Sequence, residues 1–318
     1  MIQNTLNNHL IYWYNDDENQ RWRKDHSDYT SMRIGGCSRA PFSAKIEWTR
    51  IARLLIDQYP DITIFMSGGL DSEIALRCFL AAGIKPKLAT IRFPDDKNAY
   101  DIAPMIDLVQ KEWGLDVSII DFDPEEFCLS GEYLAIAEKY QAYTFYQQIL
   151  LKVAEDYSAP MITIDEVELE KLPEVNFDTG EAVWHWAFLK KEDQDGVWRR
   201  FADNTGIPAL NNFYTYTPES MLAFLRLPTT AALIRDQIPF KLSWTSSKIK
   251  IYSEAGFNFR MRPKWHGMEN YMHLWDFVKS NPPTGLMELA IDPQYYTIPA
   301  LELEENLAKG RISQCSIL

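Results

Sequence analysis

Apolar and polar positions follow two different periods along the first half of the chain. From Ala44 to Tyr59 the apolar residues recur at helical spacing, and Pro60 closes the element. From Asp61 to Asp123 short apolar runs alternate with amphipathic stretches, a pattern typical of buried parallel strands joined by helical crossovers. It predicts strands at 62–66, 87–93 and 117–122, and helices at 71–82 and 100–113.

Two βαβ crossovers in succession predict an α/β fold with a doubly wound, mostly parallel sheet. After Pro124 the pattern becomes mostly helical, with a fourth strand at 160–164, an acidic stretch at 166–183 expected to be a loop, and a helix at 218–227. We expect a helical lobe on the carboxyl edge of the sheet. The predicted units are an N-terminal arm with a lead-in helix (1–57), an α/β core (58–170), and a mostly helical substrate lobe with a C-terminal tail (171–318).

Composition and charge narrow the range of functions. The 318 residues are 46% hydrophobic, which is enough for a packed core, and the formal net charge is −13. Such a charge opposes binding of an extended polyanion, so a small-molecule substrate is expected and nucleic acid is not. The charged stretch from Asn15 to Arg33 lacks apolar periodicity and is expected to be a solvated surface arm.

Targeting signals and cysteine pairs are not apparent in the sequence. No run approaches the about 18 apolar residues of a membrane span, and the first residues lack a basic region followed by an apolar stretch. The four cysteines are far apart and form no CxxC pair. A reduced, cytoplasmic setting without a membrane partner is therefore expected. The cysteines are Cys37, Cys78, Cys128 and Cys315.

The hexapeptide at 67–72, Ser-Gly-Gly-Leu-Asp-Ser, joins the first predicted strand of the sheet to the next helix. Gly68 and Gly69 allow positive φ and close backbone approach, so that amide groups and the helix N-terminus can cradle an anion. The hydroxyls of Ser67 and Ser72 can donate to phosphate oxygens. Without a ligand, the same residues would form an ordinary tight turn.

Asp71 has two candidate roles in this loop. Its carboxylate can cap the helix, or it can hold a Mg²⁺ ion that bridges phosphates. A Walker-type loop is disfavoured because no lysine stands at the position that such a loop requires.

The string IFMSGGLDSEIALRC, at 64–78, resembles the ATP pyrophosphatase (PP-loop) superfamily, whose members bind ATP, attack its α-phosphate and release pyrophosphate. Further stretches are most similar to the synthetase domain of asparagine synthetase and β-lactam synthetase. The resemblance implies an adenine nucleotide alpha hydrolase-like fold, with ATP and Mg²⁺ as cofactors. It also implies an amide ligase that adenylates a small carboxylate, or a carbonyl oxygen, for transfer to ammonia or an amine. These stretches are 98–116, 143–168, 211–225 and 246–267.

The resemblance also places binding residues around the loop. Residues 67–72, with Leu70 among them, would hold the phosphates, and the backbone of Ile91, Arg92 and Phe93 at the end of the second strand would contact adenine. From its sequence context alone, Arg92 could instead pair with Asp95 or Asp96.

Catalytic roles come from the resemblance alone. An acidic loop that assists Mg²⁺-pyrophosphate would contain Asp165 and Glu166, with Asp71 and Asp165 as metal ligands. A late lysine that stabilises charge at the α-phosphate would be Lys264, with Lys248 or Lys250 as substitutes.

Two departures from the family leave alternatives open. No glycine precedes Asp165, where the family has a glycine-containing turn, and the chain begins Met-Ile-Gln instead of with a glutaminase nucleophile. Sulfur transfer or reduction through a cysteine such as Cys37, which follows Gly35 and Gly36, is one alternative. A nucleotide-binding protein without turnover is another.

Overall fold

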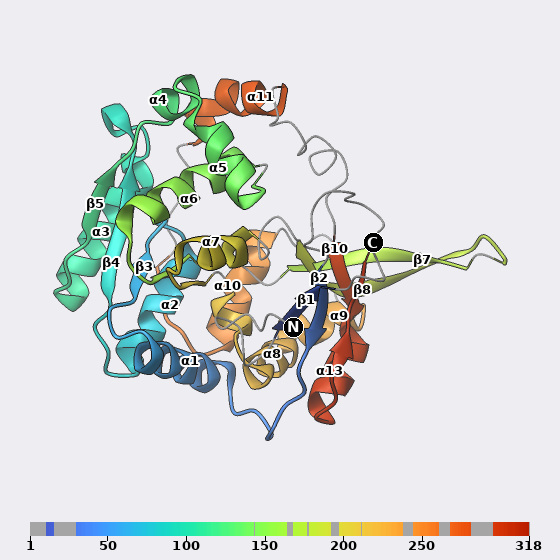
Figure 1. Ribbon diagram of the computed structural model, residues 1–318. Coiled ribbons are helices and arrows are strands. Elements are labelled where there is room, and N and C mark those ends of the chain that lie inside the picture. Colours follow the sequence, from blue (N-terminus) through green and yellow to red (C-terminus); the bar gives the residue numbers. More distant parts are fainter. Residues whose placement is uncertain are drawn as a thin grey trace.

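The computed structural model shows an α/β protein in which helices cover a parallel sheet, with smaller antiparallel sheets beside it (Figure 1). It describes residues 11–15, 30–142, 144–163, 168–176, 178–191, 197–210, 212–237, 244–260, 268–280 and 295–317.

The central sheet has five parallel strands in the order β5-β4-β3-β6-β9. The chain runs outward from β3 to β4 and β5, then crosses to the other side of β3 for β6 and β9. The strand order therefore reverses at β3, and the predicted doubly wound parallel sheet is confirmed. Its strands are β3 (Thr63–Phe65), β4 (Lys87–Arg92), β5 (Ser118–Asp121), β6 (Met161–Ile162) and β9 (Ala209–Leu210).

Neighbouring residues of the central strands point into two different hydrophobic cores, because successive side chains of a strand face opposite sides of the sheet. Ile64 and Leu88 lie in one core, and Phe65 and Ala89 lie in the other. The first core includes residues of α1 (Ala44–Gln58), α2 (Leu70–Ala81), α3 (Ala99–Trp113), α8 (Pro218–Leu225), α9 (Pro228–Ile234), α10 (Trp244–Glu254) and α13 (Ala300–Ala308). The second includes residues of α4 (Pro124–Leu129), α5 (Glu132–Tyr140), α6 (Phe145–Tyr157), α7 (Val197–Thr205) and α11 (Met272–Ser280).

The predicted helix stops of the core are confirmed. Helix α2 is followed by Gly83 with φ of +78°, and α3 ends at Gly114 with φ of +60°. Both glycines adopt the left-handed conformation that lets the chain leave a helix and turn toward the next strand. In the part of the chain that the structure describes, short 3₁₀ helices also occur at η3 (Pro94–Asp96), η5 (Phe213–Thr215) and η6 (Met268–Tyr271).

The prediction of a solvated arm before the core is wrong at residues 30–33. Strand β2 (Thr30–Ile34) pairs with β1 (Ile11–Asn15) on one side and β11 (Ser313–Gln314) on the other. Met32, within this strand, is fully buried in the first core. The charged residues around Met32 suggested a solvent-exposed segment. The strand is instead partly buried, because it pairs with residues near the C-terminal end.

The expectation of a loop at 166–183 is also wrong over most of its length. Strands β7 (Glu168–Val175) and β8 (Ala182–Lys191) form an antiparallel hairpin, which belongs to a four-stranded sheet of order β12-β10-β8-β7. Leu169 is buried while Glu170 is exposed, so the acidic residues take solvent-facing positions of an alternating strand. The sheet is completed by β10 (Tyr295–Pro299) and β12 (Ser316–Ile317). The region after the core, which was predicted to be mostly helical, thus contains both helices and β-strands.

None of the helices in the described part of the chain is both long and apolar enough to cross a membrane.

Candidate functional site

The predicted phosphate loop lies at the carboxyl end of β3, between that strand and α2. Gly68 has φ of +74°, and a Cβ atom added there would lie 2.5 Å from the carbonyl oxygen of Asp101 in α3. Gly69 follows as the N-cap residue of α2, with extended backbone and no side-chain cap bond. The backbone therefore makes a close approach that only glycine permits, and it ends on the positive pole of a helix.

The two serines of the loop differ in their surroundings. Ser67 is exposed, and its Oγ lies 3.4 Å from the backbone nitrogen of Gly69. Ser72 is buried, and its hydroxyl donates to the carbonyl oxygen of Gly69 at 3.0 Å. Ser67 is thus exposed to solvent at the loop, whereas the hydroxyl of Ser72 forms a hydrogen bond within the first turn of α2. Leu70 is half-buried and packs against the first core.

Asp71 does not cap α2, because its side chain turns toward α10. Its Oδ2 lies 3.0 Å from Nζ of Lys248, and its Oδ1 accepts a hydrogen bond from the hydroxyl of Tyr252. The hydroxyl of Tyr214, in η5, donates to the backbone carbonyl of Asp71 at 2.5 Å. Three polar side chains from distant segments therefore converge on one residue of the loop. Lys248 and Tyr252 are four residues apart and lie on one face of α10.

Both tyrosines stay protonated in this environment. Burial raises the pKa of Tyr252 and of Tyr214 well above the usual value, and the negative charge of Asp71 adds to the effect. Each phenol is thus a hydrogen-bond donor throughout the physiological pH range. Tyr214 also packs against Trp48 of α1, with ring centroids 4.9 Å apart.

The predicted adenine-binding backbone at the end of β4 is organised by a residue that the sequence analysis missed. Asn98 donates to the carbonyl of Ile91 at 2.8 Å and accepts from the backbone nitrogen of Phe93 at 2.9 Å. These two backbone groups are therefore already paired, and the side chain of Asn98 fixes the shape of the strand end. The sequence feature that could have indicated this role is an asparagine just before a helix, because an asparagine side chain at such a position often forms hydrogen bonds with the backbone.

Arg92 pairs with a residue of the neighbouring strand, not with Asp95 or Asp96. Its Nε and a terminal nitrogen lie 2.6 Å and 2.9 Å from the two carboxylate oxygens of Asp121. In the register of the parallel sheet, Arg92 lies opposite Asp121, which explains the pairing.

Three predicted site residues, Asp165, Glu166 and Lys264, lie outside the described residues. Their roles stay predictions. Among the residues that are described, no group of three or more His, Cys, Asp or Glu side chains is placed to hold a metal ion.

The cysteines show no activated thiol. Burial raises the pKa of Cys37 and of Cys315 to about 12, and burial also raises the pKa of Cys78 and Cys128. Cys37 is half-buried and packs against the first core, so the exposed thiol considered for its glycine-rich segment is not present. A reactive cysteine requires a lowered pKa, and none of the four has one.

Part of the chain is similar in structure to a known protein, whereas its sequence matches none of the known families. No protein-family model matches the chain, and no curated protein sequence matches it. A solved structure described as that of NMN synthetase from Francisella tularensis matches with 23% identity and a TM-score of 0.27. The match covers 38% of this chain and 54% of the other, so it spans about half of that protein. Similarity at this level assigns neither a family nor an activity.

Proposed function

We propose that the protein is an ATP-dependent adenylating ligase of the PP-loop type. It would activate a small carboxylate, or a carbonyl oxygen, with release of pyrophosphate, and pass the activated group to ammonia or an amine. The observation that supports this most is the ammonium group of Lys248 held on Asp71, beside the glycine turn at the end of β3.

The loop suits a polyphosphate. The Gly68–Gly69 turn brings backbone next to the N-terminus of α2, and exposed Ser67 adds a hydroxyl at its mouth. Backbone N–H groups and the helix dipole together favour an anion at this point. Ile91 and Phe93, fixed by Asn98, lie at the end of the neighbouring strand, where open α/β sheets bind ligands.

Lys248 supplies the cation that such a reaction needs. Charge develops on the oxygens around the α-phosphorus as the substrate oxygen attacks, and a fixed positive group stabilises it more than a mobile one does. The carboxylate of Asp71 and the packing of α10 hold Lys248 in place before substrate arrives. Lys264 stays a second candidate for this role.

Mg²⁺ would arrive with the nucleotide. This ion is usually held by one or two carboxylates together with phosphate oxygens and water, so a single described carboxylate is compatible with it. Asp71 is the described candidate and Asp165 the other. When bound, the ion would neutralise the departing pyrophosphate. The chain's own contribution is to orient Asp71 through Tyr252 and Tyr214, both of which remain donors.

Sulfur transfer is disfavoured by the pKa of the four cysteines, which burial raises in every case. A nucleotide-binding role without turnover is an outcome of the experiment below.

The test is to incubate the purified protein with ATP, Mg²⁺, ammonia and a panel of amino and carboxylic acids, and to measure AMP and pyrophosphate. We expect equal amounts of both with at least one acid. Formation of ADP instead would overturn the proposal. Calorimetric binding of ATP without consumption in any mixture would assign the protein to the binding role.

A further inference from the structure

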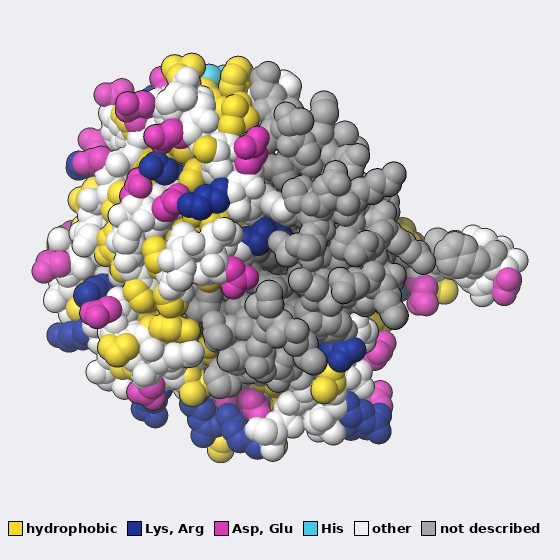
Figure 2. Space-filling view, in the orientation of Figure 1, with side chains coloured by type: hydrophobic (Ala, Val, Ile, Leu, Met, Phe, Trp, Pro, Cys, Tyr) yellow, Lys and Arg dark blue, Asp and Glu magenta, His cyan; other side chains and the backbone are white. Residues whose placement is uncertain are grey.

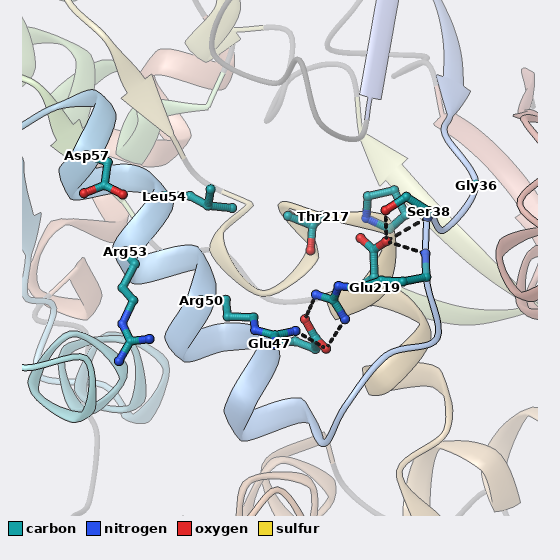
Figure 3. A pocket seen from close by; sticks show the side chains of 11 residues that line it. Gly36, Ser38, Glu47, Arg50, Arg53, Leu54, Asp57, Thr217 and Glu219 are labelled. Atoms are coloured by element: carbon teal, nitrogen blue, oxygen red, sulfur yellow. Dashed lines mark hydrogen bonds and ion pairs between the residues drawn. The ribbon is translucent and has the colours of Figure 1, made fainter.

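A groove runs along the outer side of α1 (Figure 3). It has a volume of about 640 Å³ and lies between residues 36–39, α1 and the start of α8. No residue of the 67–72 loop lines it.

Two carboxylates in the wall of the groove are held by hydrogen bonds from within the protein. Glu47 is only 1% exposed and accepts hydrogen bonds from Arg39 at 2.8 Å and 2.6 Å and from the backbone of Phe42 at 2.6 Å. Glu219 is also buried, and its Oε1 accepts from the backbone nitrogen and hydroxyl of Ser38 at 2.8 Å and 2.9 Å.

Arg53 is the lining arginine whose charge is not used within the described wall, because Arg39 and Arg50 both form ion pairs with Glu47. Arg53 is exposed, and no described residue forms an ion pair with it, while Asp57 is the exposed carboxylate in the lining. Three arginines line the groove: Arg39, Arg50 and Arg53.

Apolar side chains accompany these arginines on the surface. Phe42 is 54% exposed, its ring lies 4.4 Å from the guanidinium carbon of Arg50, and Ile46 and Leu54 of α1 are also exposed. Figure 2 shows basic and hydrophobic side chains side by side at the lower edge of the molecule. An exposed arginine with no described ion pair, beside exposed apolar side chains, suits a partner that is acidic and apolar.

The β7–β8 hairpin of this chain has that chemistry. Its outer part, defined here as the arm (residues 172–176 and 178–184), projects from the body of the protein (Figures 1 and 2). Trp184 is 56% exposed and Val183 is 64% exposed. The arm contains no Lys or Arg and three exposed acidic residues, Glu174, Asp178 and Glu181.

The arm is ordered by its own hydrogen bonds. The backbone nitrogen of Asn176 donates to Glu181 at 2.9 Å, that of Gly180 donates to Asn176 at 2.7 Å, and the Asn176 side chain accepts from Asp178. A preformed arm loses little entropy on binding. Pro173 lies in edge strand β7 and cannot donate to a further strand, so docking would use side chains and not an extended sheet.

We propose that the arm of one copy of this chain docks in the α1–α8 groove of a second copy, with Trp184 against the exposed apolar side chains and the acidic residues facing Arg53. The arm and α1 lie at opposite sides of the molecule, so an arm does not reach its own groove (Figure 1). Reciprocal exchange closes a two-fold dimer. A stable interface buries about 1,200–2,000 Å² in total, and the two equivalent arm–groove contacts would each contribute half of that area.

Sedimentation velocity over a concentration series tests this with reversed charges. The arm variant Glu174→Lys/Glu181→Lys and the groove variant Arg53→Glu should each raise the dimer dissociation constant about tenfold or more. An equimolar mixture of the two should dimerise again, because each arm then meets a groove of opposite charge. Trp184→Ala should weaken the dimer to a similar extent.

Matched controls separate docking from general charge effects. Glu138→Lys on α5, Lys111→Glu on α3 and Tyr100→Ala on α3 change exposed residues outside both surfaces and should leave the dissociation constant unchanged. Thermal melting should show that all variants fold. The proposal is overturned by a wild-type protein that stays monomeric up to about 100 µM. It is also overturned if the arm and groove variants dimerise as tightly as the wild type. A mixture of the two charge-reversed variants that stays monomeric would overturn it as well.

Discussion

The ammonium group of Lys248 lies 3.0 Å from the carboxylate of Asp71, although 177 residues separate them in the chain. This ion pair joins α10 to the first turn of α2 and brings a cation to the glycine turn. Tyr252, one helical turn after Lys248, holds the other carboxylate oxygen. The charge of the candidate site is therefore set jointly by an early loop and a late helix.

Replacing Lys248 with Gln should slow ATP-dependent AMP formation about 10²–10³-fold, the usual loss when one preorganised charge-stabilising group is removed. The matched control is Lys250→Gln, on the exposed side of the same helix, which should keep the wild-type rate. Single-turnover measurement of AMP compares the two. Equal rates would move the proposed role to Lys264.

Gly68→Ala should destabilise the protein more than Gly83→Ala does. Both glycines have positive φ, so each substitution carries backbone strain of about 1 kcal/mol. At Gly68 the new methyl group also meets the carbonyl of Asp101 at 2.5 Å, whereas nothing lies within 4 Å at Gly83. We expect an additional loss of about 1–3 kcal/mol in the free energy of unfolding, measured in urea, for Gly68→Ala alone. ATP affinity should fall only in that variant, and equal destabilisation would contradict the close approach.

Glu47→Gln should lower stability in a pH-dependent way. Burial opposes ionisation of Glu47, but hydrogen bonds from Arg39 and Phe42 outweigh it and hold the pKa of the carboxyl below its ordinary value of 4.5. The ionised form therefore stabilises the fold above that pH, and this stabilisation is lost as pH falls through the folded-state pKa. At pH 7 we expect Glu47→Gln to lower the free energy of unfolding by about 1–2 kcal/mol. This value is small for a buried charge pair because Arg39 is partly exposed to solvent.

Denaturation of the wild type and of Glu47→Gln at a series of pH values checks this expectation. The difference between the two proteins should shrink below pH 4.5, while Glu138→Gln, on the surface of α5, should match the wild type throughout. A difference that does not change with pH would show that the charge of Glu47 is not its source.

Cys37 should resist alkylation in the native protein. With a pKa of about 12, raised by burial and then by the charge of Glu219, roughly one molecule in ten thousand carries the thiolate at pH 8. Mass spectrometry after iodoacetamide treatment should show labelling that accelerates about tenfold per pH unit between pH 7 and 9 without a plateau. Rapid labelling at pH 8 would restore sulfur transfer as a candidate activity.

The core from β3 to β5 follows from local sequence signals. Short apolar runs mark the strands, helical periodicity marks α2 and α3, and Gly83 and Gly114 end these helices. Each signal lies within a few residues of the feature it predicts, so tertiary contacts are not needed to recognise it.

Features that depend on distant partners were not predicted. Glutamates in β7 suggested a loop because they take the exposed face of a strand whose pairing partner is β8. Met32 is buried because β2 pairs with β11, near the other end of the chain. For the candidate site, the loop was visible in sequence, but the contact of Lys248 with Asp71 depends on how α10 packs across α2. The lysine was recognised only as one of three possibilities.

The distance along the chain between Asp71 and Lys248 also orders events during synthesis. A ribosome adds about 5–20 residues per second, so Lys248 follows Asp71 by roughly ten to thirty-five seconds. During that interval β3, β4 and β5 can already pair, while the carboxylate in the loop still lacks its ammonium partner. The nascent protein thus has the glycine turn of the candidate site well before it has the ammonium group beside it, and the arrival of α10 joins the two.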